Sequence, residues 1–401
     1  MAKISIQNVS KVFGPHPKQA LELAAKGVSR ADILRKTRTT LALHDISLDI
    51  TDSELLVIMG LSGSGKSTLL RCLNGLIMPT TGHILVDGED ITTMSDQKLR
   101  QVRQRCFGMV FQNFALFPHR SVLQNTAFGL EVMGVSKDVR LKKSEEILER
   151  VGLTQWKNSL PGQLSGGMKQ RVGLARALAL EPEILLMDEA FSALDPLIRQ
   201  EMQDELLALQ DDIHKTIVFI THDLNEAFKI GDRIVLLQDG VVVQTGTPEN
   251  ILQAPANDHV ARFVASADAS QVLTAASVMK RSEDVAVLGL DGPRAALRKM
   301  RVHSIASLFV LDRHRRFVGI INADDAKQMV TEGRSDLTEI TSTDIITVSP
   351  DTSVTELVPL MADLPYPLAV VDERRRLVGV IVRGLLLGSL VEHSRGGAHA
   401  A

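Results

Sequence analysis

The stretch ELLVIMGLSGSGKSTLL (residues 54–70) decides the fold of this chain, whose 401 residues suggest two or three domains. Its apolar first part predicts a buried strand, and KSTLL begins a helical pattern. Between them, Gly60 to Ser67 matches GxxxxGK[ST] in the strand–loop–helix context of a phosphate-binding loop, which makes a chance Gly/Ser turn a poor alternative. Lys66 would neutralise β- and γ-phosphates, and Ser67 would hold Mg²⁺. We therefore expect a nucleoside triphosphate here.

A second apolar run, EILLMDE (residues 183–189), supplies the acidic partner that such a metal needs. Asp188 would bind Mg²⁺ through water, and Glu189 would polarise the attacking water as a general base. Alone, an Asp-Glu pair at a strand end usually marks the start of a helix. Beside a phosphate loop, the functional interpretation is favoured.

Between these motifs lies LSGGMKQ (residues 164–170), in which Ser165, Gly166 and Gly167 open a helical pattern. Backbone N–H groups at a helix N-terminus bind anions, so this is a candidate second anion site. The alternative is a simple N-cap, since serine is a favoured cap residue.

The first 250 residues alternate strands with helices, which predicts an α/β fold with a mostly parallel sheet covered on both faces. Residues 3–13 alternate apolar and polar side chains as a half-buried strand does. Residues 15–40 interrupt this order, and we expect two short, basic, amphipathic helices separated by Gly27.

Composition excludes several classes of protein. A formal net charge of −3 and 3% aromatic residues argue against a nucleic-acid-binding protein. Cys72 and Cys106 are too few for a disulfide framework or a four-ligand zinc site and fit a reducing cytosol. No signal peptide and no run of 18 apolar residues is expected, so any membrane role is peripheral.

The C-terminal third contains an internal repeat. SLFVLDRHRRFVGII (residues 307–321) and PLAVVDERRRLVGVI (residues 367–381) align at a constant offset, and each predicts a strand, a charged turn and a second strand followed by a helix. Units of this size rarely bury a core alone, so the two copies should pack together as one module.

The motifs together resemble the nucleotide-binding subunit of an ABC transporter. The phosphate loop, LSGGMKQ, ILLMDE, SALD (residues 192–195) and ITHD (residues 220–223) occur in that family's order and spacing. The resemblance implies a P-loop ABC ATPase domain, with a mostly parallel sheet, a helical subdomain and an antiparallel β subdomain. It also implies ATP and Mg²⁺ as ligands.

Longer stretches resemble the ATP-binding subunits of glycine betaine/L-proline importers, a pattern that choline and carnitine importers share. The later residues resemble, more loosely, the α+β tandem CBS pair of many such subunits. The implied domains are an ABC domain (1–265, with the helical insertion 15–40), a linker (266–275), a first and a second CBS copy (276–332 and 333–393) and a tail (394–401).

The ABC resemblance assigns roles to individual residues. Gln112 matches the Q-loop glutamine at Mg²⁺ and the attacking water, and His222 matches the switch histidine at the γ-phosphate. Phe13 occupies roughly the adenine-stacking position, although a core phenylalanine at a strand end is nearly as good an interpretation. Ser165, Gly166, Gly167 and the D-loop aspartate Asp195 are implied to serve ATP held by the other subunit. The residues expected to bind ATP are Phe13, Gly60, Ser62, Gly63, Ser64, Gly65, Lys66, Ser67 and Thr68, and those for Mg²⁺ are Ser67, Gln112 and Asp188.

The same resemblance implies partners and a location. We expect a homodimer of ATPase subunits, two integral membrane permease subunits and a substrate-binding protein, with this chain peripheral on the cytoplasmic face of the inner membrane. The expected function is ATP-driven import of an osmoprotectant such as glycine betaine, proline or choline; import of another small polar substrate is the alternative. ABC proteins of DNA repair have long coiled coils before LSGGMKQ, and translation factors have two motif sets. A nucleotide sensor based on CBS copies alone would not explain Glu189 and His222.

The CBS resemblance makes two predictions about ligands. Asp325 stands where the family holds ribose, whereas the second copy has Leu385 there. Six arginines occupy the two repeated turns: Arg313, Arg315, Arg316, Arg374, Arg375 and Arg376. They are either solvated hairpin tips or contacts for an anionic membrane surface. In importers of this kind, the CBS pair is linked to sensing ionic strength.

Overall fold

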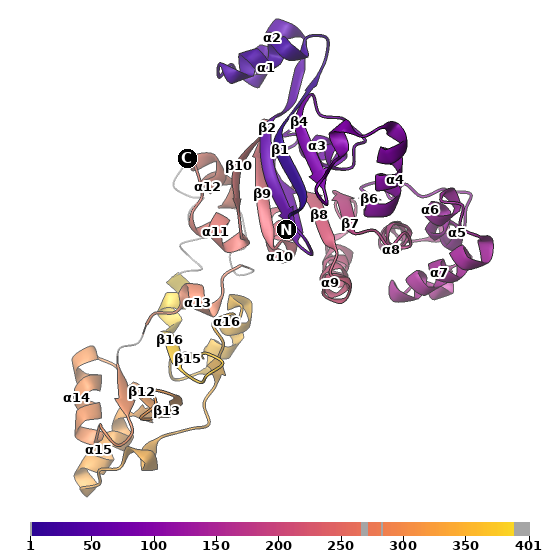
Figure 1. The fold of residues 1–401 in the computed structure, drawn as a ribbon. Helices are drawn as coiled ribbons and strands as arrows, with labels where there is room; N and C mark the ends of the chain where they lie inside the picture. Colours follow the sequence, from indigo (N-terminus) through magenta and orange to yellow (C-terminus); the bar gives the residue numbers. More distant parts are fainter. Residues whose placement is uncertain (1, 266–271, 282–283, 389–401) are drawn as a thin grey trace. The chain divides into compact units, whose positions relative to one another are not determined.

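A computed structural model describes residues 2–265, 272–281 and 284–388, and the chain divides at residue 260 into two compact units (Figure 1). In the described ranges, no helix combines the length and the apolar character needed to cross a bilayer.

A six-stranded, mostly parallel sheet forms the centre of the first unit, as its apolar strands predict. Its order is β10-β9-β3-β8-β7-β6, and only β10 is antiparallel to its neighbour. The strands are β3 (Leu55–Met59), β6 (Phe107–Phe111), β7 (Ile184–Asp188), β8 (Thr216–Thr221), β9 (Arg233–Gln238) and β10 (Val241–Gly246). β3 and β8 are buried along their whole length because both faces of the sheet are covered.

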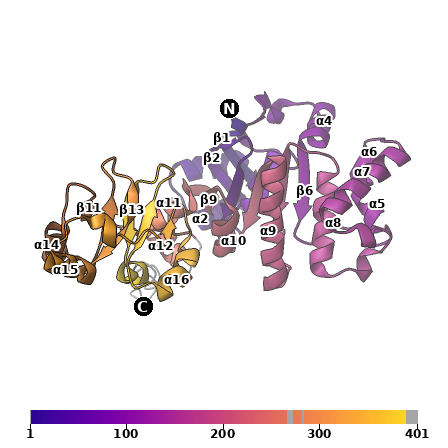
Figure 2. The ribbon, with the colours of Figure 1, turned by 90° about the horizontal axis from the view of Figure 1, so that it is seen from below.

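An antiparallel sheet of order β2-β1-β4-β5 packs on this central sheet. Its strands are β1 (Ala2–Phe13), β2 (Thr40–Thr51), β4 (Thr81–Val86) and β5 (Glu89–Asp90). One apolar cluster contains Ile4 of β1, Ile58 of β3 and Leu69 of the helix after the phosphate loop, so the two sheets and this helix share a core. In Figure 2, α9 and α10 lie on the side of the central sheet away from β1 and β2.

The helices of this unit form a covering layer, a helical subdomain (α5–α8) and an arm (α1 and α2). The expected pair of short helices within residues 15–40 is confirmed by the arm, which shares a small apolar cluster with β1 and β2 around Ile33. The helices are α1 (Pro17–Ala25), α2 (Arg30–Thr37), α3 (Lys66–Leu73), α4 (Asp96–Cys106), α5 (Val122–Thr126), α6 (Phe128–Val132), α7 (Lys137–Arg150), α8 (Gly166–Leu178), α9 (Pro196–Ile213), α10 (Leu224–Ile230) and α11 (Pro248–Gln253). The division at residue 260 falls within α12 (Asp258–Val264).

The second unit contains the two copies of the repeat, each with a three-stranded sheet. The orders are β11-β12-β13 and β14-β15-β16. The strands are β11 (Val285–Val287), β12 (Ser307–Leu311), β13 (Phe317–Asn322), β14 (Thr347–Val348), β15 (Leu368–Val371) and β16 (Leu377–Ile381), and the helices are α13 (Ala275–Val278), α14 (Pro293–His303), α15 (Ala323–Glu332) and α16 (Val354–Asp363). Phe309 and Phe317 of the first copy share a cluster with Ala369 and Val380 of the second, which confirms that the copies pack together.

Each copy begins with a segment that pairs with the other copy. Lys280 bridges to Val380 of β16, and Ser342 bridges to Ile320 of β13. The repeated glycines explain this exchange: a Cβ on Gly319 would collide with the Ser342 carbonyl oxygen, and a Cβ on Gly379 would collide with the Met279 side chain. Glycine at both positions therefore lets the exchanged segments approach the hairpins.

Candidate active site

The phosphate loop follows β3 and leads directly into α3. Gly60, Gly63 and Gly65 have φ values of +149°, +78° and +109°, which only glycine adopts readily. At Gly60 a Cβ would also collide with the Leu237 carbonyl oxygen on β9. The sequence therefore forms a loop whose curvature depends on glycine, with the N-terminus of α3 at its end.

Lys66 is the first residue of α3, and its side chain turns back into the loop. Its Nζ donates hydrogen bonds to the carbonyl oxygens of Gly60 (2.8 Å) and Leu61 (3.1 Å). Burial lowers the pKa of Lys66 below its usual range, although Glu189 and Asp188 counteract part of that effect. Ser64 nearby is 5% exposed and its Oγ has no partner among the described residues, so the loop retains an unused polar group.

A hydroxyl and a carboxylate meet beside the loop: Ser67 Oγ donates to Asp188 Oδ1 over 2.9 Å. Oxygen ligands of this kind suit Mg²⁺, which typically takes one or two carboxylates together with substrate phosphates. No cluster of three or more His, Cys, Asp or Glu residues suited to a metal occurs in the described part of the chain, so a cage made of protein alone is not formed there. The residues present fit a Mg²⁺ ion that is shared with phosphate.

Gln112, Glu189 and His222 converge because they follow three adjacent parallel strands, β6, β7 and β8. Gln112 Nε2 donates to Glu189 Oε2 over 3.4 Å, and His222 Nδ1 lies 3.3 Å from the same oxygen. Glu189 itself has φ +46°, and its N–H donates to the Ile220 carbonyl of β8 over 3.0 Å. Functional groups thus meet at the carboxyl ends of the strands, where ligands bind in open α/β sheets.

A cavity of about 310 Å³ adjoins these groups. Phe13 lies in its wall with 43% of the residue exposed, so it is not a core phenylalanine, and Lys11 Nζ lies 5.0 Å from its ring centroid. The lining residues are Phe13, Arg30, Thr40, Ala42, Ser62, Gly63, Gly65, Lys66, Ser67, Thr68 and Glu189. Most of the predicted phosphate-loop residues, the aromatic and the candidate base therefore face one space, whereas Gly60 and Ser64 do not line it.

Arg30 is a residue of this cavity that sequence reasoning missed. It begins α2 of the arm, and its guanidinium donates to the Leu41 carbonyl (Nε, 2.5 Å) and the Gly63 carbonyl (Nη1, 3.0 Å). No motif marks it, and the basic character of residues 15–40 was the only signal.

The LSGGMKQ motif does not join this cavity. Ser165 caps α8 by accepting a hydrogen bond from the Met168 N–H (3.3 Å), as the N-cap interpretation predicts, and Asp195 caps α9 through the Ile198 N–H (3.1 Å). The two motifs are neighbours, since a Cβ on Gly166 would contact Leu194. Neither Ser165 nor Asp195 lines the phosphate cavity of its own chain.

Comparisons with known proteins agree with this geometry. A model of the ABC transporter family matches residues 43–192, and a CBS domain model matches residues 275–331 and 337–392. The chain is 52% identical to the glycine betaine transport ATP-binding protein OpuAA of Bacillus subtilis, over 97% of this chain and 92% of that protein. This chain belongs to the ABC transporter ATP-binding proteins of the glycine betaine type.

Further members of this ABC family and a solved structure extend the comparison. The glycine betaine/proline betaine transport system ATP-binding protein ProV of Escherichia coli is 48% identical over 97% of both chains. The dimeric structure of the ATP-binding cassette MJ0796, described as a post-hydrolysis state bound to ADP and Pi, is 33% identical with a TM-score of 0.52, over 61% of this chain and 98% of that one. The chain is thus an ABC ATPase that binds ATP, and the expected α/β fold is confirmed.

In this ABC protein, the segment after Gln112 is tied to the helical subdomain. Asn125 holds it through hydrogen bonds to the Phe117 backbone: the Phe117 N–H donates to Asn125 Oδ1 (2.8 Å), and Asn125 Nδ2 donates to the Phe117 carbonyl (3.1 Å). The Phe117 ring packs on Phe128 with centroids 4.4 Å apart. The segment that follows Gln112 is therefore anchored on α5 and α6.

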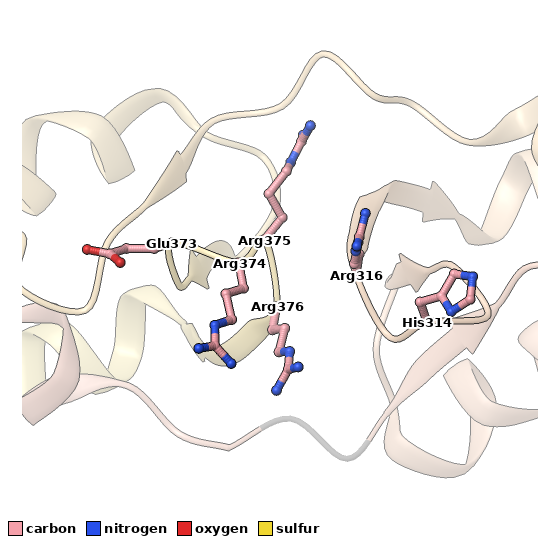
Figure 3. A pocket seen from close by; sticks show the side chains of 6 residues that line it. All are labelled: His314, Arg316, Glu373, Arg374, Arg375 and Arg376. Carbon is pink, nitrogen blue, oxygen red and sulfur yellow. The ribbon is translucent and has the colours of Figure 1, made fainter.

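The CBS copies of this ABC protein contain a second, separate cavity, between the turns of the two hairpins. Arg316, Arg374, Arg375 and Arg376 line it with His314 and Glu373 (Figure 3), whereas Arg313 and Arg315 do not. Asp325 lies in the first turn of α15 and does not line this cavity, and Leu385 lies in helical residues 383–388.

Proposed function

We propose that this chain is the ATP-hydrolysing subunit of an importer for a quaternary-ammonium osmoprotectant such as glycine betaine. One observation carries the hydrolytic part: Glu189 lies between Gln112 and His222, at 3.4 and 3.3 Å, beside the Ser67–Asp188 pair. The proposed substrate class is the one in the names of two relatives, from Bacillus subtilis and Escherichia coli. Another small polar substrate is the alternative.

Each side chain has one task in this proposal. Backbone N–H groups of the phosphate loop and Lys66 bind the phosphates, and Phe13 stacks on the adenine. Glu189 accepts a proton from the attacking water, while Gln112 and His222 orient that water and the γ-phosphate. Ser67 and Asp188 would hold Mg²⁺, which supplies charge neutralisation of the phosphates. Thr68, next to Ser67 at the start of α3, also lines the cavity and binds ATP in this proposal.

Two copies of the chain would share each site. Ser165, Gly166, Gly167 and Asp195 lie outside their own chain's cavity, and the N-terminus of α8 is suited to an anion. A dimer with two-fold symmetry would place this helix end against ATP bound by Lys66 of the other copy. The dimeric cassette structure among the comparisons supports this arrangement.

The remaining partners follow from the transporter family. We infer two membrane permease subunits that contact the helical subdomain near Gln112, a substrate-binding protein, and a peripheral position on the cytoplasmic face of the inner membrane. The proposed domains remain 1–265, 276–332 and 333–393. Part of the linker 266–275, the end of the second CBS copy and the tail 394–401 lie outside the described residues.

The test is to reconstitute the complete transporter with Glu189→Gln and to compare it with Glu22→Gln, an exposed residue of α1. Because a general base typically contributes about 10²–10⁴-fold in rate, Glu189→Gln should lower ATP turnover by that factor and abolish uptake of radiolabelled glycine betaine. Binding of ATP should be retained. Wild-type ATP turnover in Glu189→Gln would show that Glu189 is not the general base. If the parent transporter hydrolyses ATP normally but takes up no glycine betaine, glycine betaine is not its substrate.

A further inference from the structure

The backbone around Gln112 forms a tight turn with an unusual conformation. The Phe114 N–H donates to the Phe111 carbonyl over 3.2 Å, so Gln112 is the second residue of this turn. The Ala115 N–H then donates to the Asn113 carbonyl over 2.5 Å, and Phe114 and Ala115 have φ values of +58° and +49°. The left-handed region is unfavourable for a residue with a Cβ, and such residues persist only where their surroundings hold them.

The support for these two residues comes from α8, the helix that begins within the LSGGMKQ motif. Arg176 Nη1 donates to the Ala115 carbonyl over 2.5 Å, and Arg176 Nη2 donates to the Phe114 carbonyl over 3.0 Å. The helix backbone also lies close to the turn, since a Cβ on Gly173 would stand 3.7 Å from the Phe114 carbonyl oxygen. One planar guanidinium, with its fixed fork of N–H donors, therefore binds the carbonyls of both left-handed residues.

The Arg176 guanidinium depends on this contact as much as the turn does. The residue is half-buried, and burial lowers the pKa of Arg176 below its usual range, with no carboxylate among the described residues acting against that effect. A partly buried cation is costly unless its N–H groups find acceptors, and here the acceptors are the two carbonyl oxygens. The guanidinium and the turn therefore hold each other in place.

We propose that Arg176 is a positioning residue for ATP hydrolysis, because it keeps the turn closed and thereby holds Gln112 within reach of Glu189. Gln112 Nε2 lies 3.4 Å from Glu189 Oε2, at the long end of a hydrogen bond, so a small movement of the turn ends that contact. Without Arg176, Phe114 and Ala115 return to negative φ values, and the turn that carries Gln112 opens. Arg176 thus acts through the role proposed above for Gln112, on which this inference rests.

The test measures steady-state ATPase kinetics of the reconstituted transporter at varied ATP. Arg176→Met removes the guanidinium and keeps an apolar stem, whereas Arg176→Lys leaves one ammonium. Adding Ala115→Gly to Arg176→Met removes the steric cost of the left-handed conformation at one of the two held residues. The matched control adds His214→Gly instead, because His214 is also left-handed, with φ +45°, but lies at the C-terminal end of α9.

Arg176→Met should lower kcat at least about tenfold, the usual loss for one charge-assisted hydrogen bond. The KM for ATP should stay within about twofold of the parent value, because Arg176 does not line the nucleotide cavity. Arg176→Lys should lose less than Arg176→Met. Ala115→Gly should raise the kcat of Arg176→Met about fivefold, which corresponds to the steric cost of one left-handed residue, and His214→Gly should not raise it.

Three results would overturn the role of Arg176: an unchanged kcat in Arg176→Met, a KM that rises as kcat falls, or the same effect of both glycine substitutions. If Arg176→Met does not assemble, Arg176→Lys carries the same two glycine substitutions. Gln112→Ala, measured alongside, separates this inference from the proposed function. Parent-like turnover in Gln112→Ala would overturn the role of Gln112 and this inference with it, whereas a loss there with parent-like turnover in Arg176→Met would overturn this inference alone.

Discussion

Arg30 is the residue whose role depends most on the arm. It reaches the phosphate loop from α2 and lines the nucleotide cavity, so it should contact ATP directly. We expect Arg30→Ala to raise the KM for ATP about tenfold, the loss of one charge-assisted hydrogen bond, with a smaller effect on kcat. Steady-state ATPase kinetics at varied ATP measure this.

Arg35→Ala on the same helix is the control, because Arg35 pairs with Asp32 on the exposed face at 2.6 Å and does not line the cavity. Equal changes in both variants would show that the arm, and not the Arg30 guanidinium, is responsible. Arg30→Lys should recover only part of the effect, since an ammonium cannot form the same paired hydrogen bonds.

Sequence and structure differ in what they reveal about single residues. Glu189 was predictable from the acidic pair at the end of its strand, and Gln112 and His222 were predictable through the resemblance to the ABC family; adjacent strands bring the three residues together. Arg30 was not predictable, since its contact with Gly63 depends on how the arm helices pack around Ile33. Phe13 was ambiguous in sequence because a strand-end phenylalanine suits either a core or a cavity wall, and only its exposure decides between them.

At the scale of elements, a partly buried ion pair links the turn between β2 and β3 to β9. Glu54 is 8% exposed and accepts from Arg233 Nε over 2.6 Å and Nη2 over 3.0 Å. Burial alone would raise the pKa of Glu54, but hydrogen bonds from Arg233 and Thr51 hold that pKa below 4.5. The carboxylate therefore depends on these donors to remain charged inside the protein.

Arg233→Met should lower the free energy of unfolding by about 3 kcal/mol at pH 7, because it leaves a buried charge unpaired. The stability that a depressed carboxyl pKa contributes is present above the unfolded value of 4.5 and is lost as pH falls through the folded value. Without Arg233, burial shifts the Glu54 pKa upward in the variant, so the deficit should shrink as pH falls through that shifted pKa and then through the depressed pKa of the parent protein. Urea unfolding at several pH values measures it, and adding Glu54→Gln to Arg233→Met should recover part of the loss. A deficit that does not change with pH would contradict this account.

A substitution at Gly319 tests whether the leading segment of the second CBS copy is held on the hairpin of the first. Because a Cβ would collide with the Ser342 carbonyl, Gly319→Ala should destabilise the module by about 1–3 kcal/mol, the usual cost of overpacking. Hydrogen exchange should then speed up in residues 307–322 and 340–346 and stay unchanged in residues 55–73. Gly384→Ala, in open space within helical residues 383–388, serves as the control and should have no such effect. Unchanged exchange in Gly319→Ala would mean that the segment is not held there.

The sequence alone predicts the repeated hairpins, since VLDRHRRFVG and VVDERRRLVG each have the pattern of two strands joined by a turn. The sequence does not predict the exchange of leading segments, because that exchange depends on long-range pairing of Lys280 with Val380 and of Ser342 with Ile320. A constant-offset alignment shows that two units are alike but not which strand completes which sheet.

For the whole molecule, the shared-site proposal predicts complementation between two inactive chains. Homodimers of Lys66→Ala and of Ser165→Arg should both be inactive, since each has a defect in both sites. In the mixed dimer, both defects fall in one site and the other is wild-type. Random mixing gives heterodimers in half of the dimers with one intact site each, so about a quarter of the wild-type sites should remain. ATPase assays of co-refolded mixtures measure this, and a mixture as inactive as its components would argue against sites shared in this way.

The mutual exchange between the CBS copies also has a consequence for biosynthesis. While the ribosome is still adding the second copy, Phe309 and Phe317 of the first have no Ala369 or Val380 to pack against, and β13 has not yet received Ser342. At about 5–20 residues per second, this apolar surface stays uncovered for seconds on each nascent chain. Completion of the first copy therefore has to wait until residues 342–380 have been translated, which makes chaperone protection most valuable during that interval.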